Sequence, residues 1–307
     1  MSKYNSYYNL NIAKAIDKEK IIKFLSDYKS KNNPKVLTDK NDLGYYLGGL
    51  LEGDGHISLP SVGSTTLNRV LNPRIVFTSH IDNLGMYSLI QSELGNIGRF
   101  QQTGKNVLRY IIGDMKGIIQ ILNLVHGKLR TPKNKRFNDL IKFINLKYSL
   151  DIPYSLLDKS NLQQNAWFSG FSEADAHFGI KYVESKPKSE TRKRSVSESV
   201  SLKFRLDQRA FDKSTSIDMR PFMDTLALFL SCDIKTYKNN TNSEVLSLTV
   251  SAINDIKPII DYFNKYPLLG NKLEDFKKWE IVFNMILVKE HLTEEGKLKI
   301  KSLLNKL

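Results

Sequence analysis

Hydrophobic and polar positions follow the same order twice along the chain. The first copy opens with a helix of small and apolar residues that ends at "EGDG" and runs into the strand-like "HISLP". The next run, "NPRIVFTSHI", alternates like a half-buried strand. A helix, a hairpin turning near Thr103–Asn106 and two further helices follow at residues 82–94, 97–113, 114–125 and 131–150. This order of elements predicts an α+β domain.

The second copy opens with the helix that ends at "SEADA" and repeats the order. Its elements, including a hairpin that turns near Asn239–Asn242, are expected at residues 177–183, 200–208, 217–231, 232–251, 253–266 and 270–287. The dipeptides Asn134-Lys135 and Asn271-Lys272 each open the helix that follows the hairpin region of their copy. Two α+β halves of one design are the simplest account of this repetition.

Three segments lie outside the repeated order. Residues 1–40 form an N-terminal extension, in which residues 12–28 have the spacing of one amphipathic helix. The first domain is expected over residues 41–148, a linker over 149–163 and the second domain over 164–307. Inside the second domain, residues 184–199 are polar, rich in Ser and strongly basic. That stretch is either a solvated, flexible loop or a grip for phosphate groups.

Composition narrows the class of partner. The formal net charge is +14, with 46 Lys and Arg against 32 Asp and Glu. Such an excess favours a polyanionic partner, most often nucleic acid and less often an anionic membrane surface, although a generic basic protein is also compatible with it. Cys232 is the only cysteine, which excludes an intrachain disulfide and a thiolate zinc site. No apolar run approaches the roughly 20 residues that cross a bilayer, and the N-terminal residues do not resemble a signal or transit peptide.

The helix that opens each copy carries small residues four positions apart. Gly49 and Gly53 have this spacing in the first copy, and Gly170 and Ala174 in the second. Small residues at i and i+4 let two helix backbones approach closely. Packing the two helices on each other would bring Asp54 and Asp175, which follow these positions directly, together at one end.

Two carboxylates held that close repel each other unless a cation lies between them. Oxygen ligands of this kind suit Mg²⁺ or Mn²⁺, which keep several waters and accept phosphate oxygens. A bound metal lowers the pKa of its water and stabilises the charge that develops as a phosphodiester bond breaks. A single "EGDG" is more often ordinary helix-end chemistry, and its recurrence at the matching place favours the metal site.

These two stretches, "YYLGGLLEGDGHISL" and "AWFSGFSEADAHFGI", resemble the paired motifs of the LAGLIDADG homing endonucleases, in the single-chain, two-motif, intron-encoded form. The stretches "YPLLGNKLEDFKKW" and "KEHLTEEGKLKIKSL" are similar to the close of that family's second domain. The resemblance covers roughly residues 42–307 and leaves residues 1–40 outside. It implies an α+β fold: a pseudo-symmetric pair of αββαββα domains, each with an antiparallel DNA-binding sheet, joined at a two-helix interface.

The resemblance also implies roles for particular residues. Asp54 and Asp175 would bind the metal and act in catalysis, while Glu52 and Glu173 would be helix-end residues without a direct catalytic part. Lys135 and Lys272 would be the central basic residues of the two halves, and a lysine there can stabilise the charge on the phosphate or polarise the water. Gln208, which corresponds to Ser79 in the first half, matches a strand position that orients solvent near the metal.

Long polar side chains on the expected strands are suited to the major groove of DNA. The candidates in the first half are Arg74, Arg99, Gln101, Lys105 and Arg109, and in the second half Lys181, Lys203, Arg205, Arg209, Lys235 and Lys238. For each of them a solvated surface charge is at least as common an outcome. His56 and His177, just after the two motifs, are interpreted as strand residues that face DNA or solvent.

The leading hypothesis is therefore an Mg²⁺-dependent, site-specific DNA endonuclease, encoded by a mobile intron. It would act as a monomer on an asymmetric double-stranded target of about two helical turns and leave short 3′ overhangs. Mn²⁺ is expected to replace Mg²⁺, and Ca²⁺ to bind without supporting cleavage. The heavy use of Lys, Asn, Ile and Tyr hints at an organellar gene, so a mitochondrial location is expected. The alternatives are an RNA-splicing maturase that binds its host intron RNA, alone or as a second activity, and a DNA-binding regulator that needs no metal.

Overall fold

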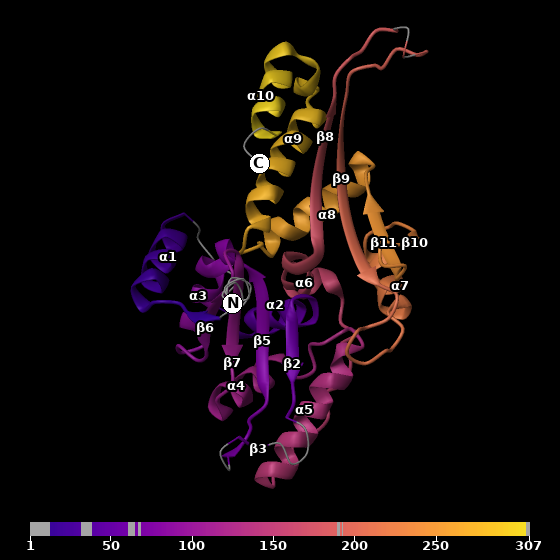
Figure 1. Cartoon of the computed structure of the whole chain (residues 1–307). Coiled ribbons are helices and arrows are strands. Elements are labelled where there is room, and N and C mark those ends of the chain that lie inside the picture. Colours follow the sequence, from indigo (N-terminus) through magenta and orange to yellow (C-terminus); the bar gives the residue numbers. More distant parts are fainter. Residues whose placement is uncertain are drawn as a thin grey trace, which may run out of the picture. The chain divides into compact units, whose positions relative to one another are not determined.

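The first antiparallel sheet carries the strands that the first copy predicts. A computed structural model describes residues 13–31, 39–60, 65–66, 69–188, 191 and 193–304 (Figure 1). In the first sheet the strand order is β1-β6-β7-β5-β2. Its strands are β1 (Lys14–Ala15), β2 (Gly55–Ser58), β5 (Arg74–His80), β6 (Arg99–Thr103) and β7 (Val107–Ile112). A separate two-stranded sheet pairs β3 (Thr65–Thr66) with β4 (Arg69–Val70).

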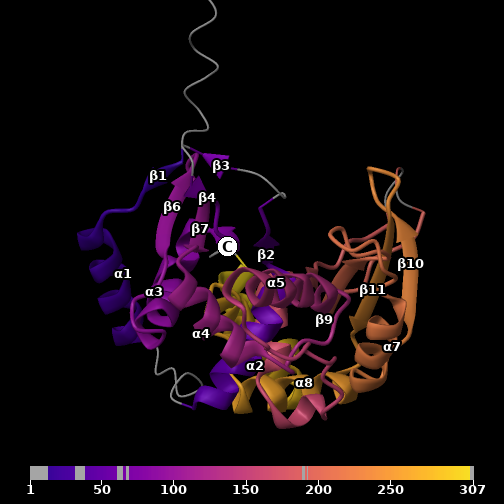
Figure 2. The ribbon, with the colours of Figure 1, turned by 90° about the horizontal axis from the view of Figure 1, so that it is seen from below.

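One face of the first sheet is apolar and covered by helices. Ile75 and Phe77 of β5 and Leu108 and Tyr110 of β7 are almost fully buried, whereas the residues between them on β5 are more exposed. Figure 2 shows the helices α3 and α4 on one side of strands β6 and β7. The helices of this half are α2 (Lys40–Gly53), α3 (Leu84–Glu93), α4 (Met115–Val125) and α5 (Lys133–Tyr148), with a short 3₁₀ turn η2 (Ile81–Asn83). The alternation leaves the opposite, polar face to solvent or a partner.

The second sheet repeats the order of the first. Its order is β10-β11-β9-β8, which matches β6-β7-β5-β2 strand for strand. Its strands are β8 (Ala176–Val183), β9 (Ser199–Arg209), β10 (Ile234–Lys238) and β11 (Glu244–Val250). The helices are α6 (Trp167–Asp175), α7 (Arg220–Phe229), α8 (Ile253–Lys265), α9 (Lys272–Leu287) and α10 (Glu294–Leu304), with 3₁₀ turns η3 (Leu162–Gln164) and η4 (Glu290–Leu292). The predicted α+β fold with two antiparallel sheets and both hairpins is confirmed.

The chain forms two compact units that do not coincide with the two sequence copies. The first unit contains residues up to Asp175 together with the segments Phe211–Phe222 and Tyr266–Asn271. The second contains Ala176–Ala210, Met223–Lys265 and Lys272–Leu307. Helix α6 belongs to the first unit because it packs against α2 along its length. Two segments from the second copy therefore complete the first unit, and both of them bear on the site described below.

The N-terminal extension contributes more than the predicted helix. Helix α1 (Lys18–Lys31) begins six residues later than expected and packs on α3, where Tyr28 lies against Gly85. Ahead of it, Ala15 pairs with Gln101, so the extension adds an edge strand to the first sheet. That two-residue strand was not predicted, because so short a segment carries no hydrophobic period. The start of the predicted helix, Ile12, lies outside the described residues.

The basic stretch 184–199 extends the hairpin of β8 and β9 in its described part. An antiparallel bridge between Lys186 and Val196 continues the pairing beyond the two strands. Helix α10 supports the same hairpin, since Lys297 bonds Glu198 and Lys301 bonds Glu184, each at 2.8 Å. The expected loop is therefore in part an extension of the second sheet. Among the described helices, none is both long and apolar enough to span a membrane.

Candidate active site

Helices α2 and α6 meet through their small residues. A Cβ on Gly49 would overlap the carbonyl oxygen of Trp167 and lie 2.6 Å from the nitrogen of Phe171. A Cβ on Gly170 would overlap the carbonyl oxygen of Tyr46 in the same way. Further along, Gly53 faces the side chain of Ala174. The structure thus places the four predicted interface residues where the two backbones are in direct contact, as small-residue spacing allows.

Helices α2 and α6 run in parallel, because Gly170 lies against Tyr46 and Leu50, and Gly53 lies against Ala174 further along both helices. Both helices therefore end at the same place. Asp54 caps α2, with its N–H bonded to the carbonyl of Leu50, and Asp175 is the last residue of α6. The carboxylate Oδ2 of Asp175 lies 3.5 Å from the position that a Cβ on Gly53 would take. Asp54 is half-buried and Asp175 is exposed. Two carboxylates from distant parts of the sequence therefore lie at one end of a closely packed helix pair.

This donor set fits a hard divalent cation. Mg²⁺ is held by one or two carboxylates and keeps several waters or phosphate oxygens as its other ligands. In the described part of the chain, no group of three or more His, Cys, Asp or Glu side chains is arranged to enclose a metal. A cation at Asp54 and Asp175 would complete its shell with water and with oxygens of a bound phosphodiester, which is the pattern expected of a nuclease metal.

Glu52 and Glu173 have a different task, because their carboxylates bind backbone groups of the segments that precede α5 and α9. Glu52 accepts hydrogen bonds from the N–H groups of Arg130 (2.8 Å) and Thr131 (2.6 Å) and from the indole of Trp167 (2.9 Å). Glu173 accepts from the N–H groups of Leu269 and Gly270. Burial raises the pKa of Glu52, and its hydrogen bonds work against that rise. The two glutamates therefore hold the segments that lead into α5 and α9.

Replacing Glu52 by glutamine is expected to destabilise the fold by about 1–3 kcal/mol. Both carboxylate oxygens accept from donors, so an amide would turn an NH₂ group toward the N–H of Arg130 or the indole of Trp167. The measurement is urea unfolding of Glu52→Gln beside Glu93→Gln, which changes an exposed acid at the end of α3. Equal free energies of unfolding for the two variants would contradict this role for Glu52.

These matched contacts correct the sequence alignment of the two copies. Arg130 and Thr131 correspond to Leu269 and Gly270, so Lys133, not Lys135, corresponds to Lys272. Both lysines are the first residues of their helices, which are 16 residues long in each case. The sequence predicted that Asn134-Lys135 opens α5 as Asn271-Lys272 opens α9. That prediction is wrong by two positions, because the lysine that opens α5 is Lys133. Both copies contain the dipeptide Asn-Lys, which suggested the wrong match. The correct match depends on contacts such as that between Arg130 and Glu52, which are 78 residues apart.

Lys133 lies at the end of the motif helix α2. Its ammonium donates to the carbonyl oxygens of Glu52 (2.7 Å), Gly55 (2.8 Å) and Leu51 (3.1 Å). Burial lowers the pKa of Lys133, and carboxylates around it, with Asp54 and Asp175 among them, oppose that shift. The ammonium therefore neutralises the carbonyl end of α2 beside the two aspartates, in the place where sequence reasoning put Lys135.

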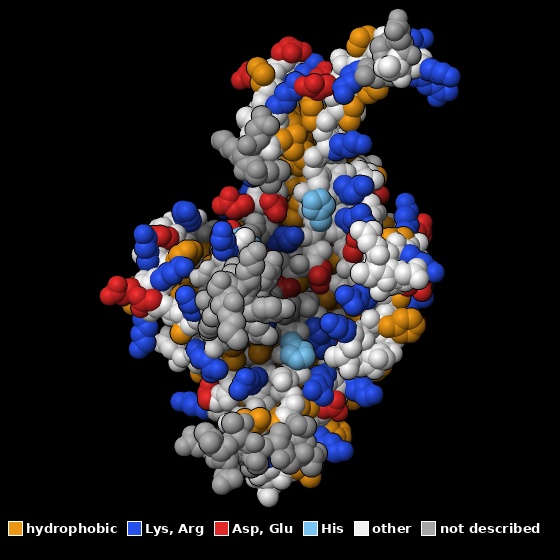
Figure 3. All heavy atoms as spheres, in the orientation of Figure 1, with side chains coloured by type: hydrophobic (Ala, Val, Ile, Leu, Met, Phe, Trp, Pro, Cys, Tyr) orange, Lys and Arg blue, Asp and Glu red, His pale blue; other side chains and the backbone are white. Residues whose placement is uncertain are grey.

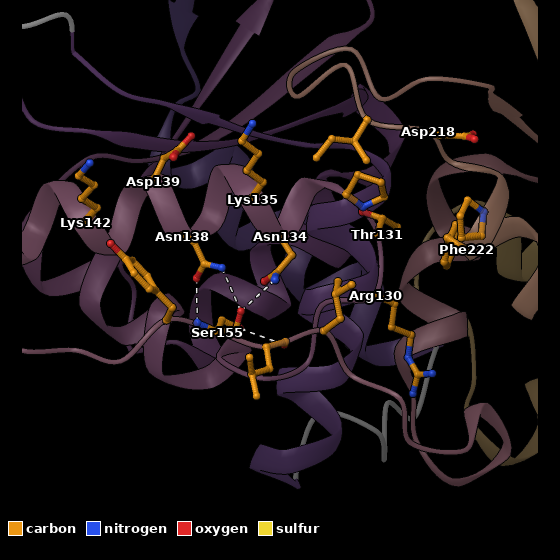
Figure 4. Close-up of a pocket in the computed structure, with 16 residues that line it drawn as sticks. Arg130, Thr131, Asn134, Lys135, Asn138, Asp139, Lys142, Ser155, Asp218 and Phe222 are labelled. Atoms are coloured by element: carbon orange, nitrogen blue, oxygen red, sulfur yellow. Dashed lines mark hydrogen bonds between the residues drawn. The ribbon is translucent and has the colours of Figure 1, made fainter.

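Lys135 is exposed. It lines a cavity of about 700 Å³ between α5 and the linker residues 154–157. Figure 4 shows Asn134 and Asn138 reaching the linker residue Ser155, while Lys135 and Asp139 point away from it. Both amide groups donate to the carbonyl of Ser155, at 2.9 and 3.0 Å. This side of α5 therefore anchors the segment between the two copies.

The register places Gln208 and Ser79 at equivalent positions. Gly55, which follows Asp54, pairs with Phe77, and Ala176, which follows Asp175, pairs with Leu206. Ser79 and Gln208 are each two residues beyond those partners. The correspondence drawn from the sequence therefore agrees with the strand pairing, and the two copies differ in the side chain that they place there.

Most of the predicted DNA-contacting residues share one face of their sheet. In the first sheet Arg109 pairs with both Thr78 and Gln101, and the polar face of these strands also carries Arg74 and Arg99. In the second sheet the corresponding face carries Lys181, Lys203, Arg205, Arg209 and Lys235. Lys105 lies in the hairpin turn, and Lys238 is exposed at the end of β10 on the opposite alternation. Figure 3 shows many Lys and Arg side chains on the surface in view.

Arg205 and His56, on these polar faces, have charged neighbours that bear on their role. Arg205 is bonded to Asp207, at 2.8 Å, and its guanidinium lies 5.4 Å from the ring centre of Tyr237. His56 and His177 are both exposed on the polar faces, as predicted for strand residues. Burial and the nearby cations, chiefly Arg136 and Lys133, lower the pKa of His56. The neutral imidazole is therefore favoured at that position.

A family model described as LAGLIDADG endonuclease matches residues 47–144 and 168–283, which include the acidic ends of both motif helices and every strand of the two large sheets except β1. The chain belongs to this family. Among curated relatives, an uncharacterized cox1 intron-2 37.2 kDa protein of Schizosaccharomyces pombe is 28% identical over 273 residues, covering 87% of this chain and 74% of the relative. The intron-encoded DNA endonuclease aI3 of Saccharomyces cerevisiae is 27% identical over 284 residues, covering 81% and 67%.

A solved structure of a LAGLIDADG homing endonuclease, I-LtrWI bound to its target DNA, has a similar fold. Its TM-score is 0.64 at 22% identity, and the match covers 88% of this chain and 98% of that one. At that identity the likeness establishes the LAGLIDADG fold, a pseudo-symmetric pair of α+β domains. The roles of single residues are therefore argued from the contacts within this chain and not from that structure.

Proposed function

We propose that this chain is a divalent-metal-dependent endonuclease that cuts both strands of double-stranded DNA at one long, asymmetric site and leaves short 3′ overhangs. The observation that carries the proposal is the pairing of α2 and α6, which brings Asp54 and Asp175 to one end of a parallel helix pair. A DNA-binding regulator has no use for two opposed carboxylates beside its partner's phosphates, since they would repel the DNA.

Asp54 and Asp175 would hold the metal ion. Mg²⁺ would support cleavage, Mn²⁺ would replace it, and Ca²⁺ would support DNA binding without cleavage. When bound, Mg²⁺ supplies an acidic water and balances the charge that develops on the phosphate. Lys133 keeps a fixed positive charge at the carbonyl end of α2, next to both aspartates. Lys272, its counterpart, and Gln208, at the strand position equivalent to Ser79, would act in the second half by stabilising charge and orienting water.

The polar faces of the two sheets are proposed to read the major groove. Their basic residues are spaced along antiparallel ribbons, the shape that this groove admits. The two faces carry different side chains, which supports an asymmetric target. Both copies are in one chain, so a monomer has the complete site. Mitochondrial origin and intron encoding are part of the proposal and are supported by the cox1 intron name of one relative.

Lys133→Met is expected to slow cleavage by roughly 10²-fold, because it removes a half-buried charge beside Asp54 and Asp175. Lys272→Met is expected to act similarly, whereas Lys135→Met should stay within about threefold of the wild type, as expected for an exposed charge. The measurement is single-turnover cleavage by the three variants, with thermal unfolding as a check on folding. A larger loss in Lys135→Met than in Lys133→Met would restore the original sequence alignment.

The experiment that tests the proposed function is selection of cleaved molecules from a randomised duplex library with Mg²⁺, and in parallel with Ca²⁺. Recovery of one asymmetric sequence with Mg²⁺ and none with Ca²⁺ supports the endonuclease. Duplex binding without cleavage in any metal would favour the regulator. Tight, specific binding of host intron RNA without DNA cleavage would favour the maturase, although the retention of both aspartates favours cleavage.

A further inference from the structure

A cationic cavity lies next to the paired aspartates and shares Lys133 with their surroundings. Its volume is about 350 Å³, the liquid volume of roughly twelve waters. The strand β2 contributes His56 and its neighbours Gly55 and Ile57, and helix α5 contributes Lys133 and Arg136. The remaining wall is the segment Asp212–Ser214, which comes from between β9 and α7 and belongs to the first unit. Neither Asp54 nor Asp175 lines it.

The segment that closes this cavity has a defined conformation. Phe211 and Asp218 form an antiparallel bridge that closes the loop. Inside the loop, Oδ1 of Asp212 accepts hydrogen bonds from the hydroxyl groups of Ser214 (2.7 Å) and Thr215 (2.8 Å) and from both their N–H groups. That oxygen is thus committed to its own turn. The turn presents the exposed residue Lys213 at the cavity.

The charge of the lining favours an anion. Lys133, Arg136 and Lys213 contribute three positive charges against the one negative charge of Asp212, so these four side chains carry a net charge of +2. Arg136 is oriented by a bond from its Nε to the carbonyl of Ile57 at 3.1 Å, and one terminal nitrogen lies 3.7 Å from Asp139. Arg136 is held in this way and keeps further guanidinium N–H groups for a phosphate, which it can bind with little loss of side-chain freedom. The ammonium of Lys133 is bonded to carbonyl oxygens and contributes its charge.

Position decides which phosphate this would be. His56 is on the polar face of the first sheet, the face that carries Arg74 and Arg109, and is two residues from Asp54. A DNA strand that crosses this face with its scissile bond at the aspartates therefore passes the cavity at a neighbouring backbone group.

We propose that the cavity formed by His56, Lys133, Arg136 and the Asp212–Ser214 turn binds a non-scissile phosphodiester of the DNA strand cut in the first half, and that Lys213 is its contributing charge from the second copy. The inference rests on the proposed DNA-binding function. It gives the loop between β9 and α7 a task in the first unit: positioning the strand for cleavage.

The test uses Lys213→Gln, with Lys213→Arg as the charge-conserving variant. Lys116→Gln is the matched control, because it removes an exposed charge on α4, which lies over the other face of the sheet. The probe is the duplex recovered by cleavage selection, bound with Ca²⁺, in which each phosphate is replaced in turn by an uncharged methylphosphonate. Lys213→Gln should weaken binding about tenfold, as expected for one lost phosphate contact, while Lys213→Arg and Lys116→Gln should not.

The methylphosphonate scan identifies the contact. In the wild type one substitution beside the cut should weaken binding, and in Lys213→Gln that same substitution should have no further effect. Additive losses at every position would overturn the proposal. If selection yields no cleaved duplex, a random-sequence duplex replaces it, and Lys213→Gln should reduce the slope of log K against log salt by about one. An unchanged slope would overturn the phosphate site whatever the fate of the nuclease proposal.

Discussion

Asp54→Asn and Asp175→Asn should each reduce double-strand cleavage by at least about 10²–10³-fold, while the DNA duplex stays bound. Asparagine keeps the size of the side chain and one oxygen but removes the charge that holds a divalent cation. Since the two aspartates are contributed by α2 and α6 to one helix end, the loss of either leaves a single carboxylate there. Binding should survive, because the basic faces of the sheets are unchanged.

The measurement is cleavage of the recovered duplex with Mg²⁺, beside its binding with Ca²⁺. Asp151→Asn, an exposed acid in the linker, is the matched control and should cleave at the wild-type rate. Full activity in either motif variant would contradict the assignment of the metal ligands. Loss of folding in a variant would be detected by thermal unfolding and would call for glutamate in place of asparagine.

Gly170→Ala should destabilise the protein by ~3 kcal/mol, which is large for the addition of one methyl group. The new Cβ would meet the carbonyl oxygen of Tyr46 and lie 2.9 Å from the nitrogen of Leu50. Both are backbone atoms of a helix, so the clash is relieved only when α2 and α6 move apart. The same displacement separates Asp54 from Asp175, and cleavage should fall together with stability.

A matched substitution separates this clash from the general cost of replacing glycine. Gly113→Ala places its Cβ 3.5 Å from Cγ of Arg74, an ordinary contact, and Gly113 is not among the glycines with positive φ. It should stay within about 1 kcal/mol of the wild type. Urea unfolding measures both variants, and equal stability of the two would contradict the close helix contact.

The parts of the fold that the sequence predicted have strong local signals. The turn residues near Thr103–Asn106 and Asn239–Asn242 predicted both hairpins, because glycine and asparagine favour tight turns. The small residues at Gly49 and Gly170 predicted the helix pair for a similar reason: only their lack of bulk permits it. The strand β1 has two residues and no such signal, so its pairing with β6 emerged only from the structure.

The parts of the site that the sequence missed depend on contacts between distant residues. Lys133 is identified by its bonds to the end of α2, about 80 positions earlier, and the phrase "NK" pointed instead to Lys135. A comparison of "TPK" (residues 131–133) with "GNK" (residues 270–272) would have given the correct match, since the lysine that ends each tripeptide is the first residue of its helix. Nothing in the sequence pointed to Lys213. Its loop follows β9 in the second copy, and only the structure shows that the loop belongs to the first unit.

Mapping the cut on both strands of the recovered duplex tests the central claim most directly. The wild-type protein with Mg²⁺ should cut each strand once, near the centre of one asymmetric site, and the ends should carry short 3′ overhangs. Neither cut should occur with Ca²⁺, although the duplex is bound. A duplex that is bound but remains intact with Mg²⁺ and with Mn²⁺ would contradict the endonuclease account.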